Sequence, residues 1–265
     1  VDPGSPAAVD EIETALRAAG VTCTRMPADE ASERWPGMRF DGDVLYQPDS
    51  GRAFASRTVA ALQRRAADHG AEVRFEEHVL AIDGAIVRTE LDEYQADTVV
   101  VAAGAWAPGL VGNLLPPLRV SREQIFHFDT VTDDWPSFIH YREPAVYGLL
   151  TPGQGVKVAE HHTGHDTSPE PDARSFEIDP EGRRRVEAYV ERWFPGLQPV
   201  PVSAETCLYT TTPDEHFVIE RRGPIVIASP CSGHGFKFAP VIGRMVADLA
   251  DGAAIAWRPR PGAVR

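Results

Sequence analysis

A short turn near the C-terminus gathers residue types that suit an anionic or electron-rich ligand. The apolar run Ile225-Val226-Ile227-Ala228 predicts a buried strand, and Ser232-Gly233-His234-Gly235 follows it as a turn. A strand, a glycine turn and a helix N-terminus together leave backbone N–H groups free for a ligand. With His234 and Lys237 in this turn, we interpret it as a site for a ring, a carboxylate or a phosphate. The alternative is an ordinary strand-to-helix connection. The helix expected next carries its apolar stripe on Val241, Ile242, Met245, Val246 and Leu249.

Two lysines are candidate functional cations. Lys237 lies between Phe236 and Phe238, which favours a half-buried amine that must bind an anion over a solvated surface lysine. Lys157 precedes His161 by four residues, so on a strand both side chains project from one face. The run His161-His162-x-x-His165 followed by Asp166 is too little evidence for a metal site, and no metal is predicted.

Cys207 is the candidate nucleophile, since a cysteine reacts through its thiolate. The alternative is a buried core cysteine on a strand, the commoner role for an isolated cysteine. Cys23, Cys207 and Cys231 are scattered and lack metal-type spacing, so neither a disulfide framework nor a zinc site is expected. We assign Cys231 to packing.

The same stretches carry a resemblance to a known family. Ser232-Gly233-His234-Gly235-Phe236-Lys237-Phe238 resembles the C-terminal flavin-contacting motif of monomeric sarcosine oxidases and N-methyltryptophan oxidases, within the D-amino-acid-oxidase-like flavoproteins. Cys207-Leu208-Tyr209-Thr210, followed by Thr212-Pro213-Asp214-Glu215-His216-Phe217, is similar to the segment in which that family attaches FAD covalently to cysteine. The two motifs stand in the family's order, and a weaker resemblance extends over nearly the whole chain.

The resemblance implies roles for individual residues. Cys207 would attach FAD, Lys157 would lie over the flavin ring and activate oxygen, and His161 would line the substrate pocket. Lys237 and Tyr147 would bind the substrate carboxylate. For Tyr147, a purely structural role as an aromatic residue on a strand face is nearly as well supported by the sequence. A fixed ammonium stabilises negative charge that develops on oxygen. Further implied cofactor contacts are Val79 on the adenosine side, Ala103, Gly104, Trp106, Ser232, Gly233, His234, Gly235, Phe236 and Lys237.

The expected fold is mixed α/β. The β-branched run within Asp97 to Trp106 predicts a parallel strand buried on both faces and ending in small residues. The resemblance implies a glutathione-reductase-like, Rossmann-type FAD domain interleaved with an antiparallel-sheet substrate domain. The G-x-G-x-x-G fingerprint is absent, because Gly153-Gln154-Gly155 and Gly233-His234-Gly235 lead to Val158 and Phe238 at the third position. We therefore expect the FAD domain to lack roughly its first third.

The expected domain pieces follow the change in texture along the chain. Residues 1–55 would belong to the substrate domain, 56–117 to the FAD domain, 118–212 to the antiparallel-sheet substrate domain and 213–265 to the FAD domain. Helices are expected at 7–19, at 57–69 with Ser56 as N-cap, and at 180–194 with Asp179 as N-cap. Strands are expected at 21–26, 72–75, 124–128, 138–141, 145–149, 155–159 and 200–209, with a hairpin about Asp83-Gly84.

Composition excludes several classes of partner. A net charge of −13 over 265 residues argues against nucleic acid, because little positive surface is available to neutralise phosphates. No apolar run approaches the length that crosses a bilayer, and no leader is visible, so we expect a cytoplasmic protein. The expected partners are an amino-acid substrate and oxygen, and the expected state is a monomer or weak homodimer.

The resemblance implies an FAD-dependent oxidoreductase acting on the CH–NH group of donors. It would oxidise a secondary amino acid, N-methyl or cyclic, to an imine and reduce oxygen to hydrogen peroxide. Two alternatives stay open at this point. One is a flavin dehydrogenase of the same fold that uses another electron acceptor, and the other is a non-catalytic, amino-acid-binding relic.

Overall fold

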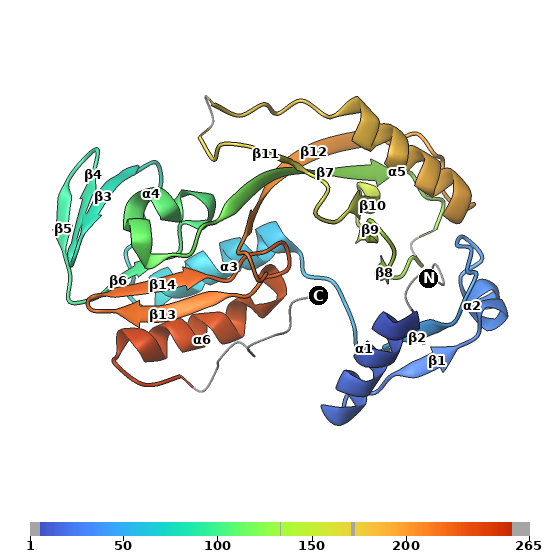
Figure 1. Cartoon of the computed structure of the whole chain (residues 1–265), viewed down its shortest axis with the longest axis horizontal. Helices are drawn as coiled ribbons and strands as arrows, with labels where there is room; N and C mark the ends of the chain where they lie inside the picture. Colours follow the sequence, from blue (N-terminus) through green and yellow to red (C-terminus); the bar gives the residue numbers. More distant parts are fainter. Residues whose placement is uncertain (1–5, 133, 171–172, 256–265) are drawn as a thin grey trace. The chain divides into compact units, whose positions relative to one another are not determined.

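The structure, a computed structural model, describes residues 6–132, 134–170 and 173–255. The chain divides into two compact units, each assembled from separate stretches (Figure 1). The first unit comprises Val1–Arg52, Arg122–His165 and Ser175–Cys207. The second comprises Ala53–Ser121, Asp166–Arg174 and Leu208–Arg265.

An antiparallel sheet forms the centre of the first unit. Strands β7 (Arg119–Phe128), β10 (Gly155–Glu160), β9 (Val146–Thr151) and β8 (Phe138–His140) are neighbours in that order. Strands β11 (His165–Asp166) and β12 (Ser203–Thr211) also pair with β7. The predicted antiparallel sheet is therefore confirmed, although β7 begins earlier and β12 begins later than the sequence pattern indicated.

One face of this sheet is the hydrophobic core of the unit. Phe126, Phe128, Val156 and Val158 are at most 1% exposed and alternate with residues of the other face. They pack against α5 (Pro180–Trp193), whose buried side chains include Val186, Tyr189, Val190 and Trp193. Alternation along β7 and β10 thus fixes which residues point to the core and which point away from it.

Helix α5 begins at the predicted cap. The Asp179 carboxylate accepts hydrogen bonds from the backbone N–H groups of Glu181 (3.1 Å) and Gly182 (2.9 Å), and Pro180 occupies the first helical position. These two bonds satisfy N–H groups that a helix leaves unpaired at its start. The helix ends at Trp193, one residue before the predicted end, and Phe194 is the C-cap.

The first 52 residues contribute two short helices and a two-stranded ladder. Helix α1 (Pro6–Ala18) confirms the helix expected at 7–19, and helix α2 (Ala28–Arg34) follows after β1. Strands β1 (Thr24–Met26) and β2 (Val44–Tyr46) pair antiparallel, so the first predicted strand is shorter than expected.

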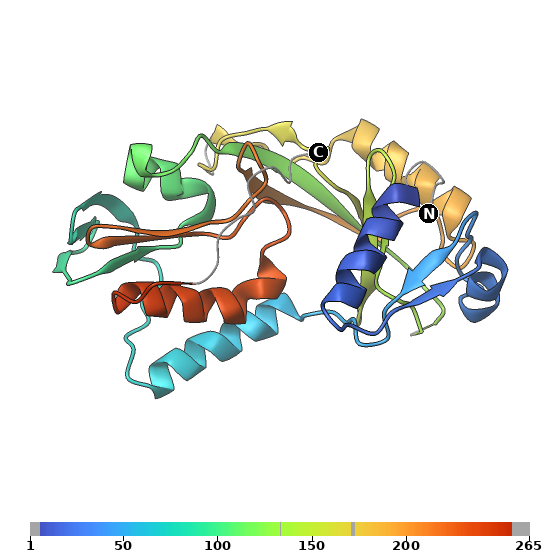
Figure 2. The ribbon, with the colours of Figure 1, turned by 60° about the horizontal axis from the view of Figure 1, so that its bottom comes forward.

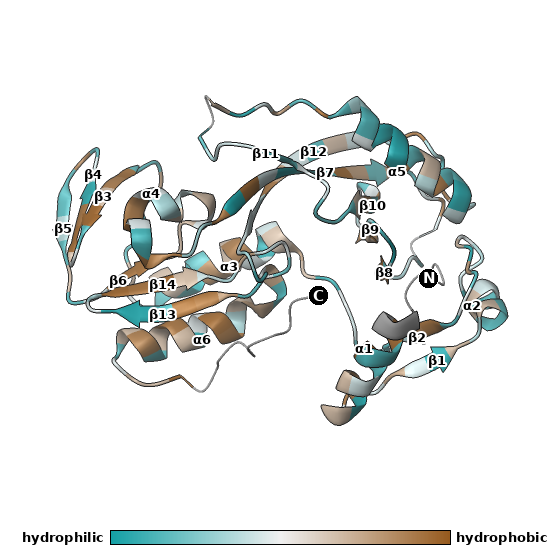
Figure 3. Cartoon of the chain, viewed as in Figure 1, coloured by the Kyte–Doolittle hydropathy of each residue, from teal (hydrophilic) through white to brown (hydrophobic). Residues whose placement is uncertain are grey.

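The second unit contains a three-stranded sheet with β14 (Ile225–Ser229) in the middle. It pairs antiparallel with β13 (Val218–Arg222) and parallel with β6 (Val99–Val101). Val226 and Ile227 are fully buried, and β6 and β14 are largely brown, hence hydrophobic, in Figure 3. The predicted parallel strand is confirmed.

Helix α6 (Ala239–Ala250) lies along β13 and β14 (Figure 2). Ile242 and Leu249 pack with Val226 of β14 and Ile219 of β13. Two burial expectations were wrong in this unit. Val100 is 43% exposed, so β6 is buried on one face only, and Val241 is 54% exposed, so the buried stripe of α6 is narrower than its apolar residues indicated.

Short helical segments that follow β6 cover the sheet face opposite α6. These are η1 (Gly104–Trp106), α4 (Ala107–Val111) and η2 (Gly112–Leu114). Ala107, Val111 and Leu115 pack in one cluster with Val99, Val101 and Ile227. The small residues after β6 therefore begin a compact helical connection.

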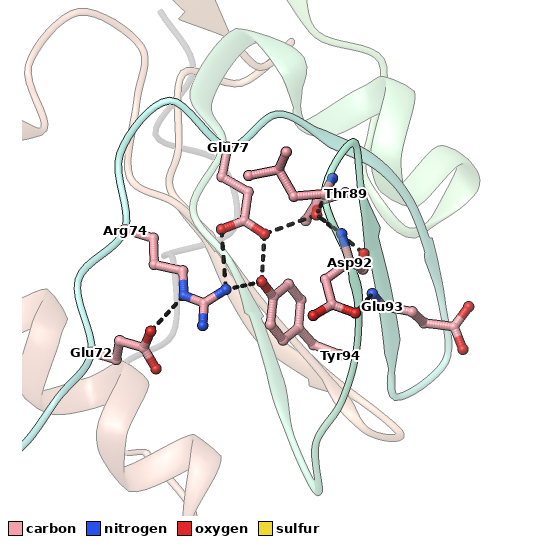
Figure 4. Close-up of polar contacts among 8 residues, drawn as sticks. Glu72, Arg74, Glu77, Thr89, Asp92, Glu93 and Tyr94 are labelled. Atoms are coloured by element: carbon pink, nitrogen blue, oxygen red, sulfur yellow. Dashed lines mark hydrogen bonds and ion pairs between the residues drawn. The ribbon is translucent and has the colours of Figure 1, made fainter.

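A three-stranded meander completes the second unit. Strands β3 (Val79–Asp83), β4 (Ile86–Thr89) and β5 (Glu93–Gln95) pair antiparallel. The predicted hairpin is confirmed, with Gly84 at φ +59°, in the left-handed region that glycine adopts without strain. Figure 4 shows how the preceding segment is attached. Glu77 accepts hydrogen bonds from Tyr94 Oη (2.5 Å) and Thr89 Oγ1 (2.8 Å).

Two further sequence predictions are corrected here. Residues 72–75 form no strand and pair with none among the described residues, and Phe75 is 68% exposed. Alternating apolar residues alone do not make a strand, because its backbone groups require a neighbour. Helix α3 (Ala55–Asp68) begins before Ser56, and its N-cap is Phe54. The helix ends at Asp68, one residue before the predicted end, and Gly70 follows at φ +89°, in the left-handed region typical of a helix stop.

Candidate functional site

The sheet face that α5 does not cover carries polar side chains in the first unit. Lys157 on β10 is directly opposite His127 on β7. On the other side of β10, Ala159 is opposite Tyr147 on β9. Because directly opposed residues of an antiparallel pair share a face, Lys157, His127 and Tyr147 all project from this one. We call it the polar face.

Lys157 is a half-buried cation on the polar face. Its Nζ lies 5.5 Å from the centroid of the Tyr147 ring, within the range of a cation–π contact. Burial lowers the pKa of the Lys157 ammonium, because loss of hydration disfavours the charged form. Negative charge on Cys207 and Glu205 acts in the opposite direction and supports the ammonium.

His161 follows β10 and lies beside the same tyrosine. Its ring centroid is 6.1 Å from that of Tyr147, with the rings nearly perpendicular. The backbone N–H of His161 donates to the carbonyl oxygen of Ala145 at 2.8 Å, which fixes the chain at the end of the strand. The structure therefore brings together Tyr147, Lys157 and His161, three of the residues singled out in the sequence.

Cys207, on β12, is a half-buried free thiol. Burial raises the pKa of the Cys207 thiol, and the negative charges of Glu123 and Glu205 add to this effect. The positive charge of Lys157 works against it and favours the thiolate. Cys207 and Lys157 therefore lie on strands of the same sheet, and each favours the charged form of the other.

A second group of predicted site residues lies in the second unit, in the turn after β14. Ser232 is fully buried at φ +58°, and its N–H donates to the carbonyl oxygen of Thr210 at 2.7 Å. Gly233 follows at φ +78°, and the His234 ring lies 5.1 Å from that of Phe217. The turn is therefore bound to β12 through the backbone.

Two glycines in this turn are required by close approach. A Cβ on Gly233 would overlap the Tyr209 ring, and a Cβ on Gly235 would overlap the carbonyl oxygen of Pro230. Both positions exclude any side chain, so the backbone of the turn stays bare. A bare turn before a helix suits a ligand that approaches main-chain N–H groups.

Lys237 differs from its expectation. The sequence predicts a half-buried amine, whereas Lys237 is exposed and its Nζ donates to the carbonyl oxygen of His234 at 3.2 Å. Phe236 and Phe238 are also exposed, at 43% and 41%, because all three residues form a short 3₁₀ turn, η4 (Phe236–Phe238), ahead of α6. The flanking aromatic rings therefore do not enclose the amine.

Four further predicted cofactor contacts, of which Val79 is the one expected on the adenosine side, also belong to the second unit. Val79 opens β3, and Ala103 follows β6 as the N-cap of η1. Gly104 has φ +53°, which turns the chain into η1, and Trp106 is 39% exposed. Ala103, Gly104 and Trp106 thus follow the C-terminal end of β6, and Val79 lies on the three-stranded meander.

The sequence reasoning missed three ionisable residues of the polar face. His127 is 3% exposed and directly opposite Lys157, Glu123 is 2% exposed, and Glu205 lies two residues before Cys207. A signal was present in the sequence. Glu123 and His127 are four residues apart on one expected strand, and Glu205 and Cys207 are two apart on another. On a strand, such even spacing places the two residues of each pair on one face.

Two observations bear on whether these residues fit a flavin. The bare turn at Gly233 and Gly235 offers main-chain groups without side chains. The buried Ser229 Oγ, at the end of β14, and the buried Thr211 Oγ1 have no hydrogen-bond partner among the described residues. Buried hydroxyls are normally satisfied, so they are available for the polar atoms of a ligand. The arrangement fits a cofactor of this kind.

Comparison with known proteins identifies the family. Residues 3–249 match the family described as FAD dependent oxidoreductase. The chain belongs to this family of FAD-dependent oxidoreductases. It is 30% identical over 266 residues to monomeric sarcosine oxidase from Bacillus sp. (strain B-0618), covering 93% of this chain and 68% of that protein. It is 32% identical over 251 residues to human peroxisomal sarcosine oxidase, covering 85% of this chain and 63% of that protein.

The fold comparison agrees with this family. The solved structure of NikD, described as an unusual amino acid oxidase, matches with a TM-score of 0.80 and 25% identity. The match covers 94% of this chain and 70% of NikD. The chain therefore spans roughly two thirds of the length of these relatives.

No group of three or more His, Cys, Asp or Glu side chains in the described part of the chain is arranged to hold a metal ion. None of the described helices combines the length and the apolar character needed to cross a membrane.

Proposed function

We propose that the complete protein is an FAD-dependent amine oxidase of the sarcosine oxidase type. Its substrate would be a secondary amino acid, N-methyl or cyclic, which is oxidised to an imine while oxygen is reduced to hydrogen peroxide. The proposal is supported by the family, by relatives named as sarcosine oxidases and by the chemistry of the polar face.

The observation that carries the proposal is the setting of Lys157. Its half-buried ammonium lies over the Tyr147 ring, and a negative charge on Cys207 would stabilise it. The chain belongs to a family of FAD-dependent oxidoreductases. A cation fixed in a poorly hydrated place stabilises negative charge that develops during a reaction, and no solvent has to reorganise around it. Reduction of oxygen is such a reaction, so we assign this role to Lys157.

The other site residues bind and orient. We propose Tyr147 and Lys237 as ligands of the substrate carboxylate, since a phenol and an exposed ammonium both donate hydrogen bonds to an anion. His161, held beside Tyr147, would line the substrate site. FAD, when bound, would supply the two-electron oxidation of the amine, with the protein contributing position and charge.

Attachment of the cofactor is assigned to Cys207. Cys207 would hold the flavin through its sulfur, and the positive charge of Lys157 favours the thiolate form of that sulfur. We propose that Val79, Ala103, Gly104 and Trp106, together with the turn at residues 232–237, contact the cofactor. The pieces 56–117 and 213–265 would then belong to the FAD domain, and 1–55 and 118–212 to the substrate domain.

The first experiment is an absorption spectrum of the protein expressed from its complete reading frame, recorded before and after acid precipitation. We expect flavin bands that remain with the precipitated protein and that disappear from it in Cys207→Ser. Cys231→Ser is the matched control, because Cys231 is also a half-buried free thiol, and it should keep the bands. A colourless protein that refuses added FAD would contradict the proposal.

Substrate class is tested with the flavin-containing protein. Sarcosine, larger N-methyl amino acids and cyclic imino acids are supplied in turn, and oxygen consumption and peroxide are measured together. Matched stoichiometric oxygen loss and peroxide release support an oxidase. Flavin reduction by substrate without oxygen consumption would instead identify a dehydrogenase of the same fold. Flavin that no amine reduces would leave a binding protein.

A further inference from the structure

Glu205 is an exposed carboxylate on the strand that carries Cys207. The two residues are separated by one position on β12, so their side chains project from the same face. Strand β12 pairs with β7, which carries His127, and β7 pairs with β10, which carries Lys157. Ser203, two residues before Glu205 on β12, lies with its Oγ 3.3 Å from Nδ1 of His127, so Glu205 belongs to the polar face. From there its negative charge favours the charged forms of Lys157 and His127 and disfavours the thiolate of Cys207.

The ionisable groups of the polar face come from four elements. Glu123 is buried and accepts a hydrogen bond from the Gly164 N–H at 2.9 Å, and its charge acts on Cys207. His127 is buried beside Lys157, and burial lowers the pKa of its imidazole, which favours the neutral ring. These groups are Glu123 and His127 on β7, Tyr147 on β9, Lys157 on β10, and Glu205 and Cys207 on β12. His161, just after β10, lies beside Tyr147.

The neighbours of Lys157 differ in whether they carry a negative charge that can balance its ammonium. The residues directly opposite Lys157 are His127 on β7, whose burial favours the neutral ring, and Leu149 on β9, and the Tyr147 ring is a diagonal neighbour. None of these three side chains neutralises an ammonium. Cys207 supplies negative charge only when it is ionised, and it loses that charge if its sulfur is bonded to carbon. Glu205 is an exposed carboxylate, and its charge does not depend on whether the cysteine sulfur is bonded.

We propose that Glu205 is the permanent counter-charge of Lys157, a positioning residue that holds it as an ammonium and restrains ionisation of Cys207. The catalytic meaning of this inference rests on the proposed oxidase function, because Lys157 is the cation proposed to serve oxygen reduction. The electrostatic relation between Glu205 and Lys157 stands apart from that function and can be measured without substrate or flavin.

The composition of the chain makes the measurement direct. Lys157 and Lys237 are the only two lysines in the 265-residue sequence. Lysine labelled with ¹³C at Cε therefore gives two NMR signals, which Lys157→Arg and Lys237→Arg variants assign. Following both signals against pH reports the ionisation of each amine in the flavin-free protein.

The decisive variant is Glu205→Gln, which keeps the shape of the side chain and removes its charge. We expect the Lys157 titration midpoint to fall by about 0.5 pH unit, equivalent to about a threefold larger neutral fraction at a fixed alkaline pH. The Lys237 signal, from the second unit, is the internal control and should keep its midpoint. Glu191→Gln is the matched charge control, because Glu191 is an exposed residue of α5, which packs on the opposite face.

The outcomes separate cleanly. A Lys157 midpoint that moves no further in Glu205→Gln than in Glu191→Gln, or that rises, overturns the inference. Glu205→Asp retains the charge, so its Lys157 titration midpoint should stay closer to the wild-type value than that of Glu205→Gln. Glu205→Thr provides a second neutral variant should Glu205→Gln not fold. If the midpoint moves as expected in a protein that oxidises no amine, the proposed function fails while the counter-charge stands.

Discussion

The Nζ of Lys157 lies 5.5 Å from the centre of the Tyr147 ring, on neighbouring antiparallel strands. The register that opposes Ala159 to Tyr147 gives Lys157 and Tyr147 the same face, turned away from the core under α5. The ring covers part of the amine without neutralising it, so the charge persists in a half-buried place. This relation is the basis of the proposed oxygen chemistry.

Replacing Lys157 with Met should impair the reaction with oxygen far more than oxidation of the amine. Loss of one preorganised charge typically slows the step it serves by about 10²- to 10³-fold. The flavin-containing enzyme would be reduced anaerobically and mixed with oxygen in a stopped-flow instrument. Anaerobic reduction by substrate is the internal control and should change little. Equal loss in both steps would assign Lys157 to substrate binding instead.

Cys207 should be a sluggish thiol at neutral pH. Burial and two carboxylates raise the pKa of its thiol, so the reactive thiolate becomes dominant only in alkaline solution. In a flavin-free Cys23→Ser, Cys231→Ser background, the iodoacetamide rate should rise steeply with pH beyond the range of an ordinary cysteine. Adding Lys157→Met removes the favourable cation and should displace the profile further toward high pH. A profile unchanged by Lys157→Met would disprove the coupling.

Gly235→Ala should destabilise the protein by about 2–4 kcal/mol. The new Cβ would overlap the Pro230 carbonyl oxygen, and backbone cannot yield as a flexible side chain does. Gly243→Ala in α6 is the matched control, because its Cβ meets no neighbour and alanine favours a helix by about 0.5–1 kcal/mol over glycine. Urea unfolding of both variants measures the difference. Equal stabilities would show that the turn relaxes.

Asp179→Ala should cost about 1 kcal/mol through loss of the α5 cap. Hydrogen bonds from the Gly182 and Glu181 N–H groups lower the pKa of the Asp179 carboxyl, so its stabilisation is complete above the unfolded-state pKa. That stabilisation is lost as pH falls through the lower, folded-state pKa. Asp179→Asn keeps a capping side chain but lacks this pH dependence. Urea unfolding at neutral and at acidic pH would distinguish the three proteins, and an acid-insensitive wild type would contradict the assignment.

Local patterns in the sequence determined much of the fold. Helical spacing located α1, α3, α5 and α6, and Asp179 with Pro180 fixed the start of α5 because capping is a contact between near neighbours. The Asp83-Gly84 hairpin and the parallel strand β6 followed from residue type in the same way. The two motifs around Cys207 and the turn at residues 232–238 indicated the family, which the comparison then established.

Only the tertiary structure decided which side chains meet. Residues 72–75 have a strand pattern but no strand to pair with among the described residues, and a ladder needs two partners. Lys237 lies exposed in a 3₁₀ turn, and its Nζ meets only the Phe238 ring, at 5.4 Å from the centroid, while that ring packs on Phe217. His127 lies opposite Lys157 through the register of β7 and β10, and Glu205 joins them because β12 pairs with β7. These residues are 30 and 48 positions from Lys157, and such pairing depends on non-local hydrogen bonds that no local pattern encodes.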